Sequence, residues 1–371
     1  MNSLKKELLK YIPKDSIEFN SEVLNKFSQD RAIIEPYGNP IALVMPKSKE
    51  EIFPIIKIAN KFKVPIVTRG AGTGLTGASN AINGCILLSL HRLNKILSLD
   101  ISNRMIFVEP GVINSTIKKA VEKKNLFYPP DPASYDISSI GGNVATNAGG
   151  LCCVKYGVTR DYVIGLEVIL GTGEIINTGR KTLKNTTGLD FTGLFIGSEG
   201  TLGIITEISL KLLPTPSDPA TAIAYFDNLP SSGEAILEIF NKGFNPSLME
   251  IIDQLSLLQV EKVFKMSLDT NASCVILMQT NGINAFNDIK DMLDICKKYG
   301  AFNTKHVNNL RDGEKLFKIR RKVWPAFEKL GKSMLPEDVA VPRQHITKLL
   351  KGIIDIGKKY NIDIPTMGHA G

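Results

Sequence analysis

The sequence predicts an α+β protein built from two packed units. Its 371 residues exceed the roughly 250–300 residues at which a single hydrophobic core stops growing. With 43% hydrophobic and 22% charged residues, the composition is that of a globular chain that can fill two cores. The proline-rich stretch LPTPSDPA (213–220) separates a β-rich half from a half in which strands and helices alternate. We therefore expect the domain boundary at this stretch.

Residues 1–35 are expected to form a short helical lead, with helices at 3–11 and 21–28. IALVMP (41–46) then predicts a strand, and 48–62 a helix that begins with the capping-box spacing of Ser48 and Glu51. The apolar stripe of that helix consists of Ile52, Ile55, Ile56, Ala59 and Phe62. VPIVTR (64–69) predicts a strand that runs directly into a glycine-rich loop.

Between 84 and 214, short β-rich runs are broken by Gly, Asn and Pro, and one helix is expected near 113–125. The β-rich runs are 84–90, 104–112, 162–170, 174–179, 194–198 and 202–214. The second half predicts strands at 221–226, 247–252 and 272–280, helices at 231–242, 254–265, 284–299 and 312–330, and a strand-like NIDIP at 361–365. This pattern is typical of a sheet covered by helices.

Three glycine-rich segments stand out in the first half. RGAGTGLTG (69–77) has GxGxxG spacing after a strand, and Asp100 lies near the distance of a ribose-binding acid in a Rossmann fold. That fold needs a helix at the loop, but the turn-rich ASNAING (78–84) follows instead, which disfavours it. Two similar segments follow at 138–150 and 197–207. Backbone N–H groups in such loops bind anions, so three of them favour a long nucleotide cofactor over isolated turns.

These segments resemble the FAD-binding domain of the vanillyl-alcohol-oxidase, or p-cresol-methylhydroxylase (PCMH), type over residues 36–215. The resemblance implies two α/β subdomains with FAD between them. It implies that RGAGTG cradles the pyrophosphate, that PPDPAS (129–134) and 138–150 wrap the flavin and ribityl chain, and that GTLGIIT (200–206) closes over the adenine half. Members with covalent FAD often carry His where Thr73 stands, so non-covalent FAD is implied. The implied FAD-binding residues are Arg69, Gly70, Ala71, Gly72, Thr73, Gly74, Leu75, Pro130, Asp131, Ser138, Gly141, Gly142, Asn143, Thr146, Asn147, Gly149, Gly150, Gly200, Ile204 and Ile205.

The second half, 216–371, resembles the substrate (cap) domain of the D-lactate dehydrogenase, glycolate oxidase flavin subunit and D-2-hydroxyglutarate dehydrogenase group. The segments that carry this resemblance are FKIRRKVWPAF (317–327), EDVAVPRQHITKLL (337–350) and GHAG (368–371). A ferredoxin-like α+β domain is implied. Arg320 stands at the position of the arginine that grips the substrate carboxylate, which a planar guanidinium can do with two hydrogen bonds. His369 stands at the first ligand of a divalent metal, zinc or manganese.

In that group, GHAG continues into DGNLHP and later an EHG motif, which supply a second His ligand, an acidic ligand and the proposed base. The sequence ends at GHAG, so we expect a substrate domain truncated at its C-terminus. The sequence contexts of His91, His306 and His345 do not match the missing roles.

The resemblance implies oxidation of a D-2-hydroxy acid, D-lactate or glycolate, to the 2-oxo acid by hydride transfer to flavin N5. Electrons would then pass to a quinone or to an acceptor protein of iron–sulfur or electron-transfer-flavoprotein type. Two alternatives stay open: an FAD oxidase of another alcohol or a lactone, and an FAD-binding remnant or electron-transfer subunit without substrate turnover.

Composition excludes several other classes of function. The five cysteines show no CxxC spacing, which argues against an iron–sulfur cluster or a thiolate zinc site. The net charge of +8 is spread along amphipathic segments, which argues against nucleic-acid binding. No apolar run is long enough to cross a bilayer, and no signal peptide is recognisable. We therefore expect a cytoplasmic protein, associated at most peripherally with the inner face of the membrane.

Overall fold

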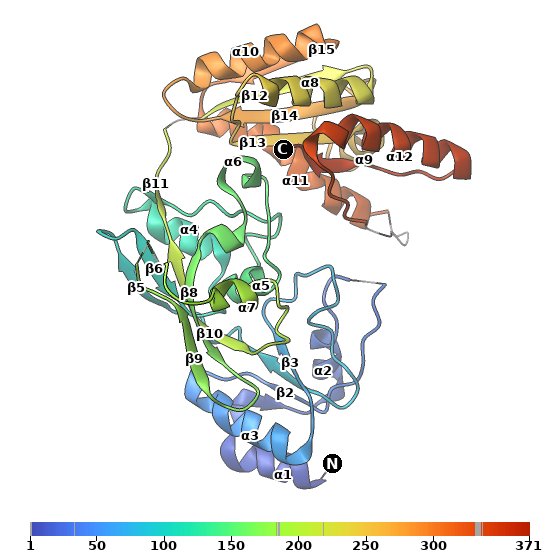
Figure 1. Cartoon of the computed structure of the whole chain (residues 1–371). Coiled ribbons are helices and arrows are strands. Elements are labelled where there is room, and N and C mark those ends of the chain that lie inside the picture. The colour runs from blue at the N-terminus through green and yellow to red at the C-terminus, as the bar shows by residue number, and fades with distance from the viewer. Residues whose placement is uncertain are drawn as a thin grey trace. The chain divides into compact units, whose positions relative to one another are not determined.

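The computed structural model describes residues 2–371 apart from 33, 183, 185, 218, 331–334 and 336 (Figure 1). It divides the chain into two compact units. The first comprises Met1–Gly149 and Val158–Thr215, and the second comprises Gly150–Gly157 and Pro216–Gly371. Asp218 of the predicted boundary stretch lies outside the described residues. The α+β fold class expected from the sequence is confirmed.

The N-terminal part of the first unit is a small, mostly parallel α/β layer. Its sheet has the order β1 (Ile17–Glu18), β2 (Ala42–Val44), β4 (Ile86–Ser89) and β3 (Ile66–Arg69), with β1 antiparallel to β2. Helices α1 (Asn2–Tyr11) and α3 (Ile52–Phe62) pack on one face, and α2 (Ser21–Phe27) packs on the other. A single-turn 3₁₀ helix, Lys14–Ser16, precedes β1. The helical lead thus shares the hydrophobic core of this unit.

The remainder of the first unit is an antiparallel sheet with short helices. The strand order is β5 (Ile96–Asp100), β6 (Met105–Val108), β10 (Ile204–Lys211), β8 (Val163–Ile169) and β9 (Ile175–Gly179). The helices are α4 (Asn114–Glu122), α5 (Ile140–Ala145), α7 (Phe191–Phe195) and a 3₁₀ turn at Thr159–Asp161. A small antiparallel pair joins β7 (Leu126–Phe127) to β11 (Leu213–Pro214).

The second unit contains a ferredoxin-like sheet. Its elements follow as β12 (Ala220–Phe226), α8 (Leu229–Asn241), β13 (Leu248–Asp253), α9 (Gln254–Phe264), β14 (Cys274–Thr280), α10 (Ala285–Lys298) and β15 (Ala301–Val307). The order β15-β12-β14-β13, with every neighbour antiparallel, is the ferredoxin-like arrangement. β16 (Met367–His369) extends the sheet beyond β13. The unit also holds α6 (Cys153–Tyr156), α11 (Leu310–Glu328), a 3₁₀ turn at Arg343–His345 and α12 (Ile346–Tyr360).

Helices cover both faces of this sheet (Figure 1). α8, α10 and α12 bury apolar residues on one face, including Ile236, Met292 and Leu350. α9 and α11 bury others on the opposite face, including Val260 and Phe317. Because successive residues of a strand point to opposite faces, Leu248, Glu250 and Ile252 of β13 share the face of α9 and α11.

Several sequence-based expectations for local structure were wrong. The segment 194–198, expected as a strand, contains the last two residues of α7, Leu194 and Phe195, and then a turn. The segment 138–150, expected as a loop, contains α5, since Gly141 and Gly142 do not prevent a helix that is held by tertiary packing. NIDIP is not a strand, and the strand instead follows it as β16. The strands β5 and β15 were not anticipated.

The expected capping box is also absent. The chain enters α3 through a 3₁₀ turn, Lys49–Glu51, whose N-cap Ser48 makes no capping hydrogen bond with its side chain. Glu51 instead accepts a hydrogen bond from the backbone N–H of Lys47, at 3.0 Å. Across the described part of the chain, no helix is both long and apolar enough to span a membrane.

Candidate functional site

The three glycine-rich segments meet within the first unit. The backbone N–H of Ala71, in the first segment, donates to Ser139 Oγ at the start of α5, at 3.2 Å. The third segment lies on α5, since Gly197 N–H donates to Val144 O at 3.0 Å and Glu199 N–H donates to Ala145 O at 2.8 Å. The first and third segments are also linked, by Thr76 Oγ1 and Glu199 Oε1 at 3.1 Å. Residues as far as 123 apart in the sequence thus line one site.

The side chain of Arg69 packs against Gly72 of the first segment. Its side chain is buried, and Nη2 donates to the carbonyl of Gln29 at 3.0 Å while Nη1 lies 3.4 Å from Ser79 Oγ. The guanidinium fits because Gly72 has no Cβ: one added there would lie 2.0 Å from Arg69 Nη2, and φ at Gly72 is +68°. Burial lowers the pKa of Arg69, and the charge of Asp30 opposes that shift. The Rossmann alternative also fails here, because Asp100 is the last residue of β5 and accepts hydrogen bonds from Asn103 in the turn that follows.

Helix α5 packs against the turn that follows β6. Gly141 N–H donates to Pro110 O at 2.8 Å, and a Cβ at Gly141 would lie 2.6 Å from Pro110 Cβ. Ser138 Oγ, just before α5, and Asn143 Nδ2, within it, are buried and have no hydrogen-bond partner among the described residues. An unpaired buried polar atom is costly, so these atoms fit a polar cofactor that would supply the missing partners.

The segment 129–138 is fastened to α4. Asn114 Nδ2 donates to Pro130 O at 3.2 Å, and Lys118 Nζ donates to the carbonyl oxygens of Tyr128 and Pro129. Asp131 is also buried, with 9% exposure. These contacts hold the backbone of the segment that was expected to wrap the flavin.

The other predicted cofactor residues differ in their surroundings. Thr146 Oγ1 donates to Gly142 O, Asn147 Oδ1 accepts from Arg160 N, and Ile204 packs into the hydrophobic core. Gly150 belongs to the segment that packs with the second unit. The remaining members of the predicted set are Gly70, Thr73, Gly74, Leu75, Gly149, Gly200 and Ile205, and their contact with FAD stays a prediction, as it does for the others.

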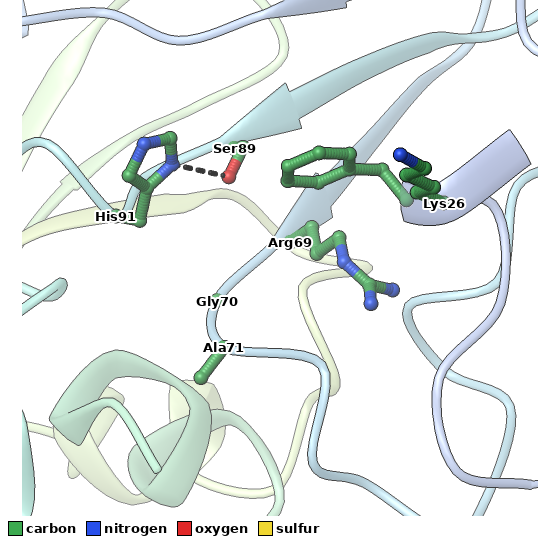
Figure 2. Close-up of a pocket in the computed structure, with 7 residues that line it drawn as sticks. Lys26, Arg69, Gly70, Ala71, Ser89 and His91 are labelled. Atoms are coloured by element: carbon green, nitrogen blue, oxygen red, sulfur yellow. Dashed lines mark hydrogen bonds between the residues drawn. The ribbon is translucent and has the colours of Figure 1, made fainter. Parts of the chain in front are cut away.

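A cavity of about 290 Å³ adjoins the first segment (Figure 2). It is lined by Lys26, Phe27, Arg69, Gly70, Ala71, Ser89 and His91. Ser89 Oγ and His91 Nδ1 lie 2.9 Å apart, and burial, followed by the charge of Arg92, lowers the pKa of His91. Figure 2 shows the guanidinium of Arg69 extending toward the side of Lys26 and away from His91.

Sequence reasoning missed Lys26, Phe27, Ser89 and His91. A usable signal existed for two of them. Ser89 ends β4 and His91 follows it, while Arg69 ends the parallel neighbour β3. The carboxyl ends of parallel strands meet at one edge of a sheet, which is where ligands bind in α/β folds.

In the second unit, Arg320 and His369 meet at one buried carboxylate. Arg320 Nε donates to Glu250 Oε2 at 2.7 Å, and His369 Nδ1 lies 2.6 Å from Glu250 Oε1. The Glu250 side chain is fully buried, that of Arg320 is 11% exposed and that of His369 is 45% exposed. Arg320 and His369, the two residues singled out from the sequence, therefore share Glu250 as a partner. The sequence analysis did not identify Glu250.

Glu250 could have been found from its pattern. It stands between Leu248, Met249, Ile251 and Ile252 in a strand whose residues are all buried. A single carboxylate in such a run must have a partner, because burying an unpaired charge is prohibitive. The cross-strand register of β13 and β16 supplies one, since Glu250 lies directly opposite His369.

No group of three His, Cys, Asp or Glu side chains in the described residues is arranged to hold a metal ion. His369 therefore contributes a single candidate ligand atom, Nε2, and the metal stays a prediction.

Family models match both parts of the chain. The model described as FAD binding domain matches residues 40–179, and the model described as FAD linked oxidases, C-terminal domain, matches residues 215–371. The chain is also similar to solved structures at a level of identity that shows the fold alone. 4-Ethylphenol oxidase from Gulosibacter chungangensis has a TM-score of 0.78 and 19% identity, covering 99% of this chain and 79% of that one. An alkyldihydroxyacetonephosphate synthase has a TM-score of 0.73 and 20% identity, covering 89% and 64%.

Sequence relatives include glycolate oxidase subunits and D-lactate dehydrogenases. Glycolate oxidase subunit GlcD of Bacillus subtilis (strain 168) is 42% identical over 334 residues, which are 90% of this chain and 71% of the relative. GlcD of Escherichia coli (strain K12) is 34% identical, covering 90% and 67%. A D-lactate dehydrogenase of Anaerostipes hadrus is 32% identical over 375 residues, covering 98% and 78%. The chain thus spans about two thirds to four fifths of the length of these proteins.

Proposed function

Since this chain belongs to the FAD-linked oxidases, as an FAD-dependent oxidoreductase of the glycolate oxidase and D-lactate dehydrogenase group, we propose that it oxidises a D-2-hydroxy acid to the 2-oxo acid. D-Lactate and glycolate are the proposed substrates, in keeping with the names of its relatives. When bound, FAD supplies the hydride acceptor, flavin N5. The set of FAD-contacting residues, non-covalent attachment and a zinc or manganese ion at His369 are parts of the same proposal.

The observation that carries this proposal is the shared carboxylate of Glu250. It brings Arg320 and His369 within hydrogen-bonding distance of one group. A 2-hydroxy acid presents a carboxylate and a hydroxyl on adjacent carbons, and therefore needs a cationic fork and a second polar group close together. Arg320 and His369 supply that combination on one face of the cap sheet.

In the proposed complex, Arg320 binds the substrate carboxylate. Its Nε is already held by Glu250, and no described residue accepts a hydrogen bond from its Nη atoms. The two Nη groups can therefore donate in parallel to the two carboxylate oxygens, which is a strong and directional interaction. His369 presents Nε2 toward the neighbouring hydroxyl.

The electrons leave through a second component in this proposal. An acceptor protein of iron–sulfur or electron-transfer-flavoprotein type, or a quinone, takes them in the cytoplasm at or near the inner membrane face.

Anaerobic addition of substrate to the FAD-loaded protein tests the proposal. D-Lactate or glycolate should bleach the visible flavin band, and L-lactate should not. The Arg320→Ala variant should lose the bleaching at ordinary substrate concentrations. Arg321→Ala is the matched control, because Arg321 is the next residue on α11 and lies 3.9 Å from Glu314 instead of at Glu250. Bound flavin that no D-hydroxy acid bleaches, or equal loss in both variants, would refute this assignment.

A further inference from the structure

We propose that Glu250 is a positioning residue that fixes the direction of the Arg320 fork and the tautomer of His369 at the same time. This inference rests on the proposed function, since it assigns the two groups that Glu250 holds to the carboxylate and hydroxyl ends of one substrate.

Both oxygens of Glu250 are committed. Oε2 accepts from Arg320 and Oε1 pairs with His369, and the carboxylate has no exposure to solvent. In the intact protein, no water therefore competes with either partner for this carboxylate. A buried ion pair of this kind resists rearrangement, because removing one partner leaves an uncompensated charge.

The contact with Arg320 uses one particular edge of the guanidinium. Because the guanidinium is planar, a bond at Nε fixes the plane and leaves the edge formed by the two Nη groups pointing away from Nε. Without this contact, the guanidinium would lose the hydrogen bond that fixes the orientation of its plane. Glu250 thus holds ready the edge that binds a carboxylate with two hydrogen bonds.

The contact with His369 selects one tautomer. A carboxylate only accepts hydrogen bonds, so Nδ1, which faces Glu250 Oε1, carries the proton of the neutral imidazole. Nε2 then keeps its lone pair, the form that accepts a hydrogen bond from a hydroxyl or ligates a cation. The 45% exposure of His369 is compatible with ligand access to Nε2.

Three separate elements create this arrangement. Glu250 comes from β13, His369 is its cross-strand partner on β16, and Arg320 comes from α11 on the same face of the sheet. A shift of one residue in the β13–β16 register would turn His369 to the opposite face. Asp253 ends the same strand, but its carboxylate accepts from Ser256 N–H, at 2.9 Å, instead.

Nitrogen NMR of histidine-labelled protein tests the inference without turnover. The sequence contains four histidines, so ¹⁵N-histidine labelling gives few signals, and His369→Gln identifies the one that matters. At a pH where the imidazoles are neutral, the wild-type His369 should show a protonated Nδ1 and an unprotonated Nε2. In Glu250→Gln the amide offers one acceptor to two donors, so this tautomer preference should be lost. Asp253→Asn, the same chemical change three residues along the strand, should preserve it.

Kinetics add a second readout. Glu250→Gln should lower kcat/KM for the hydroxy acid roughly 10- to 100-fold, as is usual when a supporting carboxylate is removed. Most of the change should appear in KM, because the Arg320 fork loses its orientation. Asp253→Asn should leave kcat/KM unchanged.

The outcomes separate the two proposals. A wild-type His369 protonated at Nε2 overturns the inference, even if the Glu250→Gln variant fails to fold, and so does a Glu250→Gln variant that keeps the wild-type tautomer. If the tautomers are as expected but no D-hydroxy acid bleaches the wild-type flavin, the proposed function is overturned, and with it the role of Glu250 toward substrate.

Discussion

Replacing Gly141 with alanine tests whether the contact between α5 and Pro110 shapes the cofactor site. A Cβ at position 141 would lie 2.6 Å from Pro110 Cβ, 2.9 Å from its carbonyl oxygen and 3.1 Å from its Cα. Carbon atoms pack best at about 3.5–4.0 Å. These atoms belong to a proline ring and its backbone, which cannot rotate out of the way, so α5 itself must move by about 1 Å.

The energetic cost can be worked out from these contacts. Overpacking typically costs about 1–3 kcal/mol, and the loss of the Gly141 N–H to Pro110 O bond costs about 0.5–1.5 kcal/mol. The better helix propensity of alanine offsets about 1 kcal/mol of this loss in the free energy of unfolding. We therefore expect a net loss of roughly 1–3 kcal/mol, which for a unit of this size lowers Tm by about 2–4 °C per kcal/mol. FAD affinity should also fall, because α5 carries the contacts of Ser139 and Val144 to the other two segments.

Gly142→Ala is the matched control on the same helix. The nearest atom to a Cβ there is Ser139 Oγ at 3.2 Å, a hydroxyl that can rotate, so the apoprotein should keep its wild-type Tm or gain slightly. Thermal unfolding of the apoprotein and titration with FAD by quenching of flavin fluorescence give the two quantities. Equal Tm values for the two variants would show that the Pro110 contact does not constrain α5.

Substitutions at three further buried polar groups test their roles. Asn143→Ala should weaken FAD binding by about 1–3 kcal/mol in the same titration while leaving the apoprotein Tm unchanged, because Asn143 Nδ2 has no partner among the described residues; a large fall in apoprotein Tm would contradict this. Burial raises the pKa of Asp253 from 3.8, so the folded state binds a proton that the unfolded chain releases, and this residue lowers stability as pH rises above 3.8. Asp253→Asn should therefore resist urea better than wild type at neutral pH and lose that advantage below pH 3.8; an advantage independent of pH would be inconsistent with this. Glu250→Leu alone should cost about 3–5 kcal/mol in urea unfolding, whereas a Glu250→Leu, Arg320→Met double variant should come within about 1 kcal/mol of wild type; a double variant no better than the single one would show that the stranded Arg320 charge is not the cause.

Local patterns predicted most of the elements but failed where packing overrides propensity. α3 was predictable because its buried residues recur at helical spacing. α5 was not, because its sequence IGGNVA contains two glycines, and one of them, Gly141, allows the close approach to Pro110 that holds the helix in place. β15 was not predicted because it is an edge strand in which no residue is fully buried. Its sequence AFNTKHV therefore shows no regular alternation of apolar and polar residues.

The sequence alone was sufficient to identify the FAD-linked family. Loops that bind a cofactor through their backbone N–H groups require glycines at fixed local spacing, and this spacing can be read directly from the sequence. It also singled out Arg320 and His369 through short motifs. Only the tertiary structure joined them to Glu250, since these partners are separated by 70 and 119 residues and meet through strand register and helix packing. The same holds for the cavity beside Arg69, whose Lys26 and His91 come from separate elements. A buried charge is specified by the partners that surround it, and the identity of those partners is a property of the folded chain.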